Sequence, residues 1–269
     1  MKGIMSDREK IIRYYRANDE GDLAARLCDL AEAAIKMRRF RISEFLDPNA
    51  MDIAETVAAH YDKINLRADG GYQGAERERA VFSHMDFAAA DLVDSEIVAI
   101  GIKWDKRYYS LNHRDVLGGL LALGVKREMM GDIVIPAGDY QAVVFFEKTI
   151  AKFVLLQAER IGGAVVELSV VENIDMLQRE ERVKDIRATV ASLRLDILAA
   201  AGFGLSRTKM AEEIEAQRVK VNWKDNSNPA AHLKQGDIVS MRGRGRMEVV
   251  SVGGQTKKGR TVVTLKRYI

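Results

Sequence analysis

Cationic side chains near the end of the chain have the types and spacing needed to bind a polyanion. Ser206 is a suitable N-cap for a helix that continues through Arg207 and Lys209, which places two cations in the first turn. The helix dipole disfavours cations at this end, and a broken local rule often marks a functional site. Because the first-turn amides have no partner within the helix, these residues predict an anion-binding site.

The residues that follow extend this cationic surface. The segment 218–223, RVKVNW, alternates between polar and apolar residues, so Arg218, Lys220 and Asn222 are expected on one exposed face of a strand. The turn KQGDIV then leads into a second strand that ends at Met241, and RGRGR follows it. Glycines between arginines allow the backbone and the guanidinium groups to approach phosphates closely.

A helix is expected just before this surface. Four apolar residues between positions 193 and 198 recur at helical spacing, so the helix has one buried face. Gly202 and Gly204 are expected to end it, because glycine readily adopts the left-handed conformation after a helix. A short second helix, two strands and the connecting turn then complete a small module that carries the cations.

The charges of the chain are distributed unevenly. Of 269 residues, 47% are hydrophobic and 30% are charged, which is a globular composition long enough for about two domains. Residues 185–269 hold 16 of the 42 basic residues and 8 of the 39 acidic residues, so their formal charge is +8 and that of residues 1–184 is −5. A basic module attached to an acidic body indicates a local contact with a polyanion.

The tripeptide His113-Arg114-Asp115 copies the catalytic loop of protein kinases. The kinase pattern requires an asparagine five residues after the aspartate, where Leu120 stands, and no D-F-G is present. A kinase is therefore rejected. Asn112 is expected to cap a helix at this point, with Asp115 at its third position. His113 and Arg114 then serve either the local cap or an external contact, and both alternatives remain open.

Other catalytic and metal-binding patterns are missing from the sequence. The four histidines have no partner histidine at metal-ligand spacing, and the single cysteine, Cys28, is expected in the core. No P-loop, G-x-S-x-G motif, signal-peptide core or apolar stretch of membrane-spanning length occurs. These observations predict a cytoplasmic protein with no catalytic residue, no metal, no cofactor and no membrane contact.

Two upstream segments carry clustered glycines or arginines. The segment 68–82 lacks the full G-x-G-x-x-G pattern, so a turn is expected there rather than a dinucleotide loop. Its Tyr72, Arg77 and Arg79 are predicted as a secondary nucleic-acid contact. The basic run at 38–41, RRFR, is expected to be a solvated helix end, with a nucleic-acid contact as the alternative.

The remaining pattern predicts an α+β architecture. Most of residues 1–62 is expected to be helical, and residues 63–68 are expected to form a strand. The order strand-helix-strand-strand-helix-strand that follows is that of a ferredoxin-like or RNA-recognition-like sheet. The expected divisions are a mainly helical region 1–95, a central βαββαβ domain 96–170, a connector helix 171–186 and a small α/β module 187–269.

The central strands leave the role of this sheet open. They are mainly aliphatic, and Phe145 and Phe146 are adjacent, so they are expected on opposite faces. A sheet dedicated to RNA exposes aromatic side chains for base stacking. The alternatives are base stacking and a structural or protein-docking role.

The ordered motifs RLD, SRTK, RVKVN and LKQGDIVSMRGRGR resemble the RNA-binding module first seen in small-subunit ribosomal protein S-four, over about residues 185–250. That fold also occurs in some pseudouridine synthases, a tyrosyl-tRNA synthetase and ribosome-rescue factors. The resemblance implies an RNA surface on this module. The expected contacts are Arg194, Ser206, Arg207, Lys209, Arg218, Lys220, Asn222, Lys234, Arg242, Arg244 and Arg246.

A second resemblance covers nearly the whole chain. The run SLNHRDVLGGLLALGVKREMMGDIVI, the upstream GGYQGAERERAVF and the C-terminal module together are similar to the YlmH-type bacterial family. This resemblance implies a non-enzymatic factor that binds ribosomal RNA or tRNA on the large ribosomal subunit. It also implies a role in rescuing obstructed subunits that hold peptidyl-tRNA and in adding a C-terminal tail to the stalled chain. A monomer is expected, with secondary contacts at His113, Arg114, Arg77 and Arg79.

Two other functions are alternatives. The first is an RNA-modifying enzyme, because this RNA module often accompanies pseudouridine synthases, which use a catalytic aspartate. Asp196 lies inside the small module, however, so a structural salt bridge or an RNA-facing role is favoured for it. A methyltransferase would need a parallel sheet with a glycine-rich loop, which this pattern does not supply. The second alternative is a regulator that binds one messenger RNA or a cell-division partner.

Overall fold

The structure is a computed structural model that describes residues 6–17, 19–136, 140–172, 174, 183–257 and 259–268. The chain divides into two compact units, residues 1–180 and 181–269. The division falls within the predicted linker 171–186, and most of the connector helix expected there lies outside the described residues. None of the helices in the described parts has the length and apolar character needed to cross a membrane.

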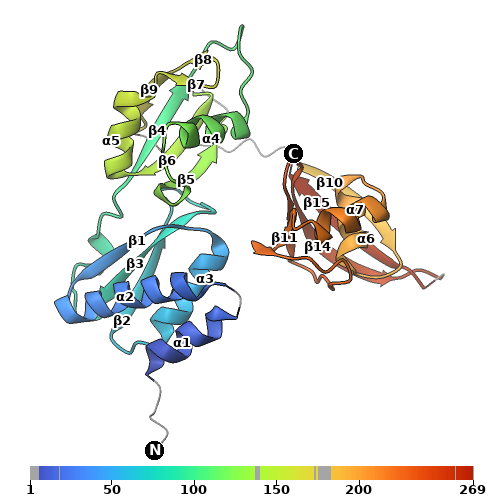
Figure 1. Ribbon diagram of the computed structural model, residues 1–269, viewed down its shortest axis with the longest axis horizontal. Helices are drawn as coiled ribbons and strands as arrows, with labels where there is room; N and C mark the ends of the chain where they lie inside the picture. Colours follow the sequence, from blue (N-terminus) through green and yellow to red (C-terminus); the bar gives the residue numbers. More distant parts are fainter. Residues whose placement is uncertain are drawn as a thin grey trace, which may run out of the picture. The chain divides into compact units, whose positions relative to one another are not determined.

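The first part of unit 1 packs two helices, α2 and α3, against an antiparallel sheet with strand order β1-β3-β2, and a third helix, α1, packs on α2 (Figure 1). Its elements are α1 (Asp7–Arg16), α2 (Gly21–Met37), β1 (Phe40–Leu46), α3 (Pro48–Ala59), β2 (Ile64–Asp69) and β3 (Glu78–His84). Ser6 caps α1 and Asp47 caps α3. Cys28 is buried in the core beneath the helices, as predicted. The helices expected from the sequence are therefore present.

The strands of this first part were mostly missed. β1 lies in a stretch expected to be helical, and β3 takes up the end of the stretch expected to be a turn. β1 pairs with β3 and β3 pairs with β2, so each strand depends on partners distant in the sequence. A short apolar segment cannot be assigned to a strand by periodicity alone, because its pairing partner decides the outcome.

The second part of unit 1 has the predicted βαββαβ order. Its main elements are β4 (Ile97–Lys103), α4 (His113–Ala122), β5 (Met130–Val134), β6 (Ala142–Glu147), α5 (Lys148–Gln157) and β9 (Glu167–Val170), with a small hairpin of β7 (Arg160–Ile161) and β8 (Ala164–Val165). The strand order is β5-β6-β4-β9, and neighbouring strands are antiparallel. This arrangement confirms the ferredoxin-like prediction.

The two faces of this sheet have different partners. Phe146 packs into the core formed with α4 and α5. Phe145 lies on the opposite face, where it packs with Phe45 of β1, and Tyr72 stacks on its ring with centroids 4.7 Å apart. Phe145 is fully buried. The face that RNA-recognition domains use for base stacking is therefore covered by the first part of unit 1, which supports the structural alternative for this sheet.

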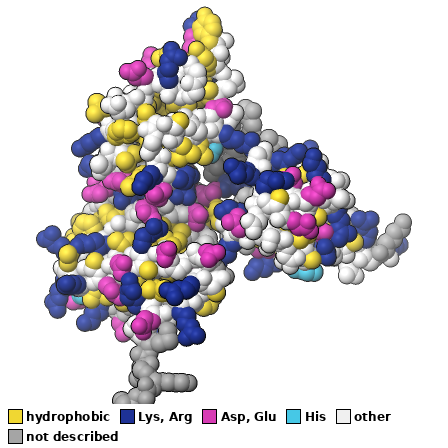
Figure 2. Space-filling model, in the orientation of Figure 1, with side chains coloured by type: hydrophobic (Ala, Val, Ile, Leu, Met, Phe, Trp, Pro, Cys, Tyr) yellow, Lys and Arg dark blue, Asp and Glu magenta, His cyan; other side chains and the backbone are white. Residues whose placement is uncertain are grey.

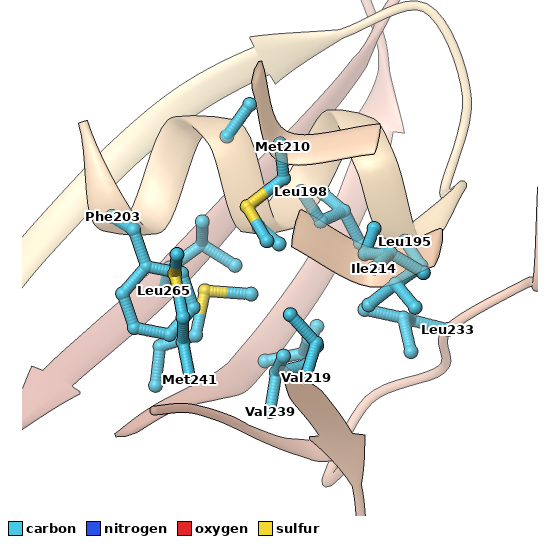
Figure 3. Packing of buried hydrophobic residues seen from close by; sticks show 14 of the residues in the cluster. Leu195, Leu198, Phe203, Met210, Ile214, Val219, Leu233, Val239, Met241 and Leu265 are labelled. Atoms are coloured by element: carbon cyan, nitrogen blue, oxygen red, sulfur yellow. The ribbon is translucent and has the colours of Figure 1, made fainter. Parts of the chain in front are cut away.

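Unit 2 packs two helices against one face of a six-stranded sheet with order β10-β15-β14-β13-β11-β12. Its elements are β10 (Val183–Val190), α6 (Leu195–Phe203), α7 (Arg207–Glu215), β11 (Val219–Val221), β12 (Lys224–Asp225), β13 (Ile238–Met241), β14 (Gly245–Gln255) and β15 (Thr261–Tyr268). The core lies between the helices and the sheet, with Leu198 and Met210 facing Val239 and Leu265 (Figure 3).

Two expectations for unit 2 are corrected by its packing. Residues 183–186, expected in a connector helix, belong to β10, which pairs along its whole length with β15. Gly204 ends α6 with a left-handed φ of 67°, as predicted, but Gly202 lies inside the helix. A β-carbon at Gly202 would overlap the sulfur of Met247, so close packing against β14 is the reason for glycine at this position.

Candidate nucleic-acid interface

A buried carboxylate organises the first group of cations. Asp196 is 2% exposed and accepts two hydrogen bonds from Arg194, both 3.0 Å long, and one of 2.9 Å from Nε of Arg207. Burial alone would raise the pKa of Asp196, but the hydrogen bonds and charges of the two arginines outweigh it and hold that pKa below its usual value. The side chains of Arg194 and Arg207 remain 32% and 58% exposed. Asp196 thus fixes two guanidinium groups at the surface.

The start of α7 has the predicted geometry. Ser206 is the N-cap, and its hydroxyl accepts a hydrogen bond of 3.2 Å from the backbone N–H of Lys209. The first turn contains no acidic residue, and both Arg207 and Lys209 are exposed. The helix therefore presents two cations at an end where its dipole would favour an anion.

A second carboxylate, Glu213 on α7, organises a second group. It forms an ion pair with Nε of Arg218, and this hydrogen bond is the main cause of its lowered pKa. The charges of Lys209 and Arg244 also lower the pKa of Glu213. The backbone N–H of Arg242 donates to the carbonyl of Arg218 at 2.9 Å. The group therefore joins α7, the start of β11 and the turn after β13.

The RGRGR segment forms the turn between β13 and β14. Met241 pairs with Gly245, and Gly243 and Gly245 have φ of 84° and 85°, which favours glycine at both positions. Arg242 and Arg244 are exposed on this turn. Sequence reasoning gave no role to Glu213, although an acidic residue five positions before Arg218 was visible in the sequence.

Two predicted contacts lie on the other face of the sheet. Val219 and Met247 are buried in the core beneath the helices, so their neighbours Lys220 and Arg246 point to the opposite face. Both residues pair with Ser240 in the strand register. Arg246 stacks on the ring of Tyr268 at 4.7 Å. The structure therefore does not bring these two cations to the surface formed by α6, α7 and the RGRGR turn.

Asn222 was expected on an exposed strand face, but the structure places it in a turn, where it has a structural role. Asn222 and Trp223 have φ of 49° and 64° and form the two-residue turn between β11 and β12. Positive φ at both central residues is typical of a type I′ hairpin turn, in which asparagine is favoured. The amide of Asn222 donates to Asp237 at 3.0 Å and accepts from the N–H of Ile238 at 2.8 Å. This geometry does not support an RNA contact through Asn222.

Lys234 lies near the first group of cations. It follows a segment that pairs with the start of α6, where Arg194 forms a β-bridge with His232. The side chain of Lys234 is exposed, while its backbone N–H donates to Asp237 at 2.8 Å. Among the predicted contacts, those that lie on or next to α6, α7 and the turn between β13 and β14 are Arg194, Ser206, Arg207, Lys209, Arg218, Arg242 and Arg244.

The predicted secondary contacts in unit 1 have different surroundings. Arg79 is 6% exposed, and its guanidinium donates to the carbonyls of Ser43, Ser95 and Glu96. Arg77 is half-buried and donates to the carbonyls of Met130 and Phe45, which lie in different parts of the unit. Both arginines therefore serve the packing of unit 1, and the structure does not support an RNA contact for them.

His113 and Arg114 are exposed in the first turn of α4. Asn112 and Asp115 form the predicted capping box, which is built from their two side chains and the backbone N–H groups of Asn112, Arg114 and Asp115. Within the described residues, no group of three His, Cys, Asp or Glu side chains is arranged to hold a metal ion.

The chain combines a ferredoxin-like domain with a C-terminal module in which two carboxylates hold arginines at the surface. This module is an S4 domain. The family model of the S4 domain matches residues 193–239. The models of the YlmH N-terminal domain and of the RNA-binding domain in YlmH match residues 19–87 and 91–175. The RGRGR turn and β10 therefore lie outside the S4 match.

Comparison with whole proteins gives the family. The chain is 34% identical over 232 residues to ribosome-associated protein quality control protein P2 of Bacillus subtilis (strain 168), a match that covers 85% of this chain and 88% of that protein. The chain belongs to the YlmH family, which confirms the resemblance seen in the sequence. A solved structure, cell division protein ylmH from Streptococcus pneumoniae, aligns with a TM-score of 0.47 and 16% identity over 65% of this chain and 99% of that one.

Proposed function

We propose that this protein is a non-enzymatic, cytoplasmic factor that binds ribosomal RNA and tRNA on the large ribosomal subunit. It acts there as a monomer in quality control of stalled peptidyl-tRNA, where a C-terminal tail is added to the chain. The observation that carries the proposal is the pair of cation groups held by Asp196 and Glu213 on unit 2. The name of the Bacillus subtilis relative, ribosome-associated protein quality control protein P2, supports the ribosomal setting.

The chemistry of the helix side of unit 2 favours phosphate groups over bases. Guanidinium groups form paired hydrogen bonds with phosphate oxygens, and arginines already held in place lose less conformational freedom on binding. In the described part of unit 2, Phe203 is buried, Trp223 and Tyr268 are half-buried, and the imidazole of His232 is exposed. One exposed ring offers little surface for base stacking, so the expected mode is recognition of structured RNA by its backbone and shape.

The surroundings of Asp196 weigh against the RNA-modifying alternative. Both oxygens of its carboxylate accept hydrogen bonds from arginines, and the residue is buried. A catalytic aspartate must reach its substrate, whereas this side chain is positioned to hold Arg194 and Arg207. A regulator that binds one messenger RNA remains the second candidate, because the same cation groups would serve it.

Co-sedimentation of the full chain with separated ribosomal subunits at low and high salt tests the proposal. Arg207→Ala/Lys209→Ala should reduce pelleting with the large subunit, because two phosphate-binding cations are lost. The control is Arg187→Ala/Lys257→Ala, which removes one arginine and one lysine from exposed positions on β10 and in the β14–β15 turn. Equal pelleting of the two double variants would contradict the placement of the interface.

The ribosomal setting has its own test. Pelleting that is sensitive to salt and specific to the large subunit, including subunits loaded with peptidyl-tRNA, is the expected result. Binding to free RNA without pelleting would favour the regulator instead. Appearance of a modified nucleotide after incubation with ribosomal RNA would establish the enzyme alternative.

A further inference from the structure

A second basic surface lies at one end of the sheet in the first part of unit 1. Because the strands are antiparallel, β1 and β2 begin at the end where β3 finishes. The backbone N–H of His84 donates to the carbonyl of Arg39, and that of Met85 donates to the carbonyl of Lys63, both at 2.9 Å. Segments that lie more than 20 residues apart in the sequence are thus joined at one end of the sheet.

Four exposed cations lie at this end of the sheet, and we term them the sheet-end patch: Lys36, Arg38, Arg39 and Lys63. In the described part of the chain, no ion pair joins any of these four to a carboxylate. Figure 2 shows Lys and Arg side chains gathered at the left edge of this part of the molecule, over the end of α2 and the start of β1. Three acidic residues adjoin the patch: Asp62, Asp86 and Glu32, which lies one turn before Lys36 on α2 and accepts a hydrogen bond from Tyr61. The four cations outnumber these carboxylates, and Glu32 also pairs with Arg8.

The backbone at Arg38 adds an independent observation. Arg38 is the C-cap of α2 and adopts a left-handed conformation, with φ of 50° and ψ of 41°. Glycine or asparagine is usual at such a position, because a β-carbon is strained there. The helix dipole favours cations near this end, which accounts for Lys36 and Arg38. Arg39 belongs to the same helix end, because its backbone N–H donates to the carbonyl of Ala34 at 3.2 Å. The dipole does not account for Lys63, which comes from a different segment, just before β2.

We propose that the sheet-end patch is a second contact for RNA phosphates, so that the chain binds RNA through two separate surfaces. The choice of RNA as partner rests on the proposed function of unit 2. A second weak surface on the same chain acts at a high effective concentration once the first has bound, so modest individual contacts give a large gain in affinity. The basic run predicted as a solvated helix end is then one half of this surface.

The test uses the full chain and two labelled RNAs in fluorescence anisotropy. One probe is deproteinised large-subunit ribosomal RNA, which can reach both surfaces, and the other is a 16-base-pair RNA hairpin. Lys36→Ala/Lys63→Ala should weaken binding of the long RNA by about fivefold to twentyfold and make its salt dependence less steep by about one to two phosphate equivalents. The matched control, Lys106→Ala/Lys152→Ala, removes two exposed lysines of the central domain and should change affinity by less than about twofold.

Combining Lys36→Ala/Lys63→Ala with Arg207→Ala/Lys209→Ala in one chain distinguishes failure of this proposal from failure of the proposed function. Residual hairpin binding should persist in Arg207→Ala/Lys209→Ala alone and be lost when Lys36→Ala/Lys63→Ala is added. If Arg207→Ala/Lys209→Ala has no effect, the interface on unit 2 is misplaced. If it weakens binding while Lys36→Ala/Lys63→Ala behaves like its control, the sheet-end patch does not contact RNA. Binding of the patch to anionic lipid vesicles in place of RNA would also overturn the proposal.

Arg38→Gly provides a second, independent variant. Glycine relieves the left-handed backbone strain, so the melting temperature should stay the same or rise. RNA affinity should nevertheless fall by about twofold to fivefold, because one phosphate contact is lost. A stable variant with unchanged affinity would show that Arg38 serves only the end of α2, and would contradict the proposal.

Discussion

At the scale of single residues, acidic side chains decide where the cations of unit 2 are held. Asp196 and Glu213 each bind an arginine from another segment, and Asp196 binds two. An acidic residue on a surface for RNA lowers the local positive potential. Asp196 and Glu213 are explained if RNA binding gains more from guanidinium groups held in place than it loses from the lower positive potential.

Asp196→Asn tests this explanation, because the change keeps the size of the side chain and removes its charge. RNA affinity should fall by about threefold to tenfold, since an amide oxygen cannot hold both arginines as a carboxylate does. A purely electrostatic effect would instead raise the affinity. Fluorescence anisotropy with an RNA hairpin measures the change, and Glu212→Gln, which removes an exposed acid from α7, serves as the control.

The same variant has a signature in the dependence of stability on pH. The pKa of Asp196 is lowered in the folded protein, so its contribution to stability is present above the unfolded pKa of about 3.9 and is lost as pH falls through the lower, folded pKa. The melting temperatures of the wild-type protein and of Asp196→Asn should therefore differ at neutral pH and become equal as the pH falls into the strongly acidic range. A difference in melting temperature that stays constant at all pH values would show that the arginine contacts do not stabilise the ionised form of Asp196.

At the scale of elements, close packing of α6 against β14 positions the start of the basic module. The helix carries Asp196 on its first turn and Gly202 near its end, where Met247 leaves no room for a β-carbon. The position of the helix on the sheet therefore also determines where Arg194 and Asp196 lie.

Gly202→Ala should lower the free energy of unfolding by about 1–2 kcal/mol, because overpacking outweighs the gain in helix propensity. Gly118→Ala is the matched change in α4, where a β-carbon would meet no atom within 4 Å. That variant should be stabilised by about 0.5–1 kcal/mol. Denaturant melts report both values, and an equal gain in the two variants would refute the packing argument.

At the scale of the whole molecule, hydrogen bonds and apolar packing join the two parts of unit 1. Arg77 donates to carbonyls in both parts, and Asp132 of β5 accepts hydrogen bonds from Tyr72 at 2.7 Å and from the backbone of Glu76 at 2.7 Å. Phe45 of β1 packs against Phe145 of β6 in the same contact. Unit 1 is therefore expected to unfold as one cooperative body.

Phe45→Ala should destabilise unit 1 by about 3–5 kcal/mol, because Phe45 is 2% exposed and its loss leaves a cavity. Calorimetry should show the first and second parts of unit 1 melting together in the wild-type protein and at a lower temperature in the variant. Independent melting of the two parts, with only one of them affected, would contradict the cooperative unit.

Local features were predictable from the sequence alone. The caps at Ser206, Asn112 and Asp47 depend on residues within three positions of the helix start, so short-range chemistry determines them. The βαββαβ order and the basic C-terminal module also follow from periodicity and charge. Each of these features depends on neighbours along the chain, which a sequence displays directly.

Only the tertiary structure decided which cations share a surface. Strand register and a two-residue turn at Asn222 send Lys220 and Arg246 to the face away from the helices. Packing between the two parts of unit 1 buries Arg79, although its sequence context resembles an exposed basic run. Pairing of β1 and β2 with the two sides of β3 brings Arg39 and Lys63 to the same end of the sheet. These outcomes depend on contacts between distant residues, whose geometry local propensity does not contain.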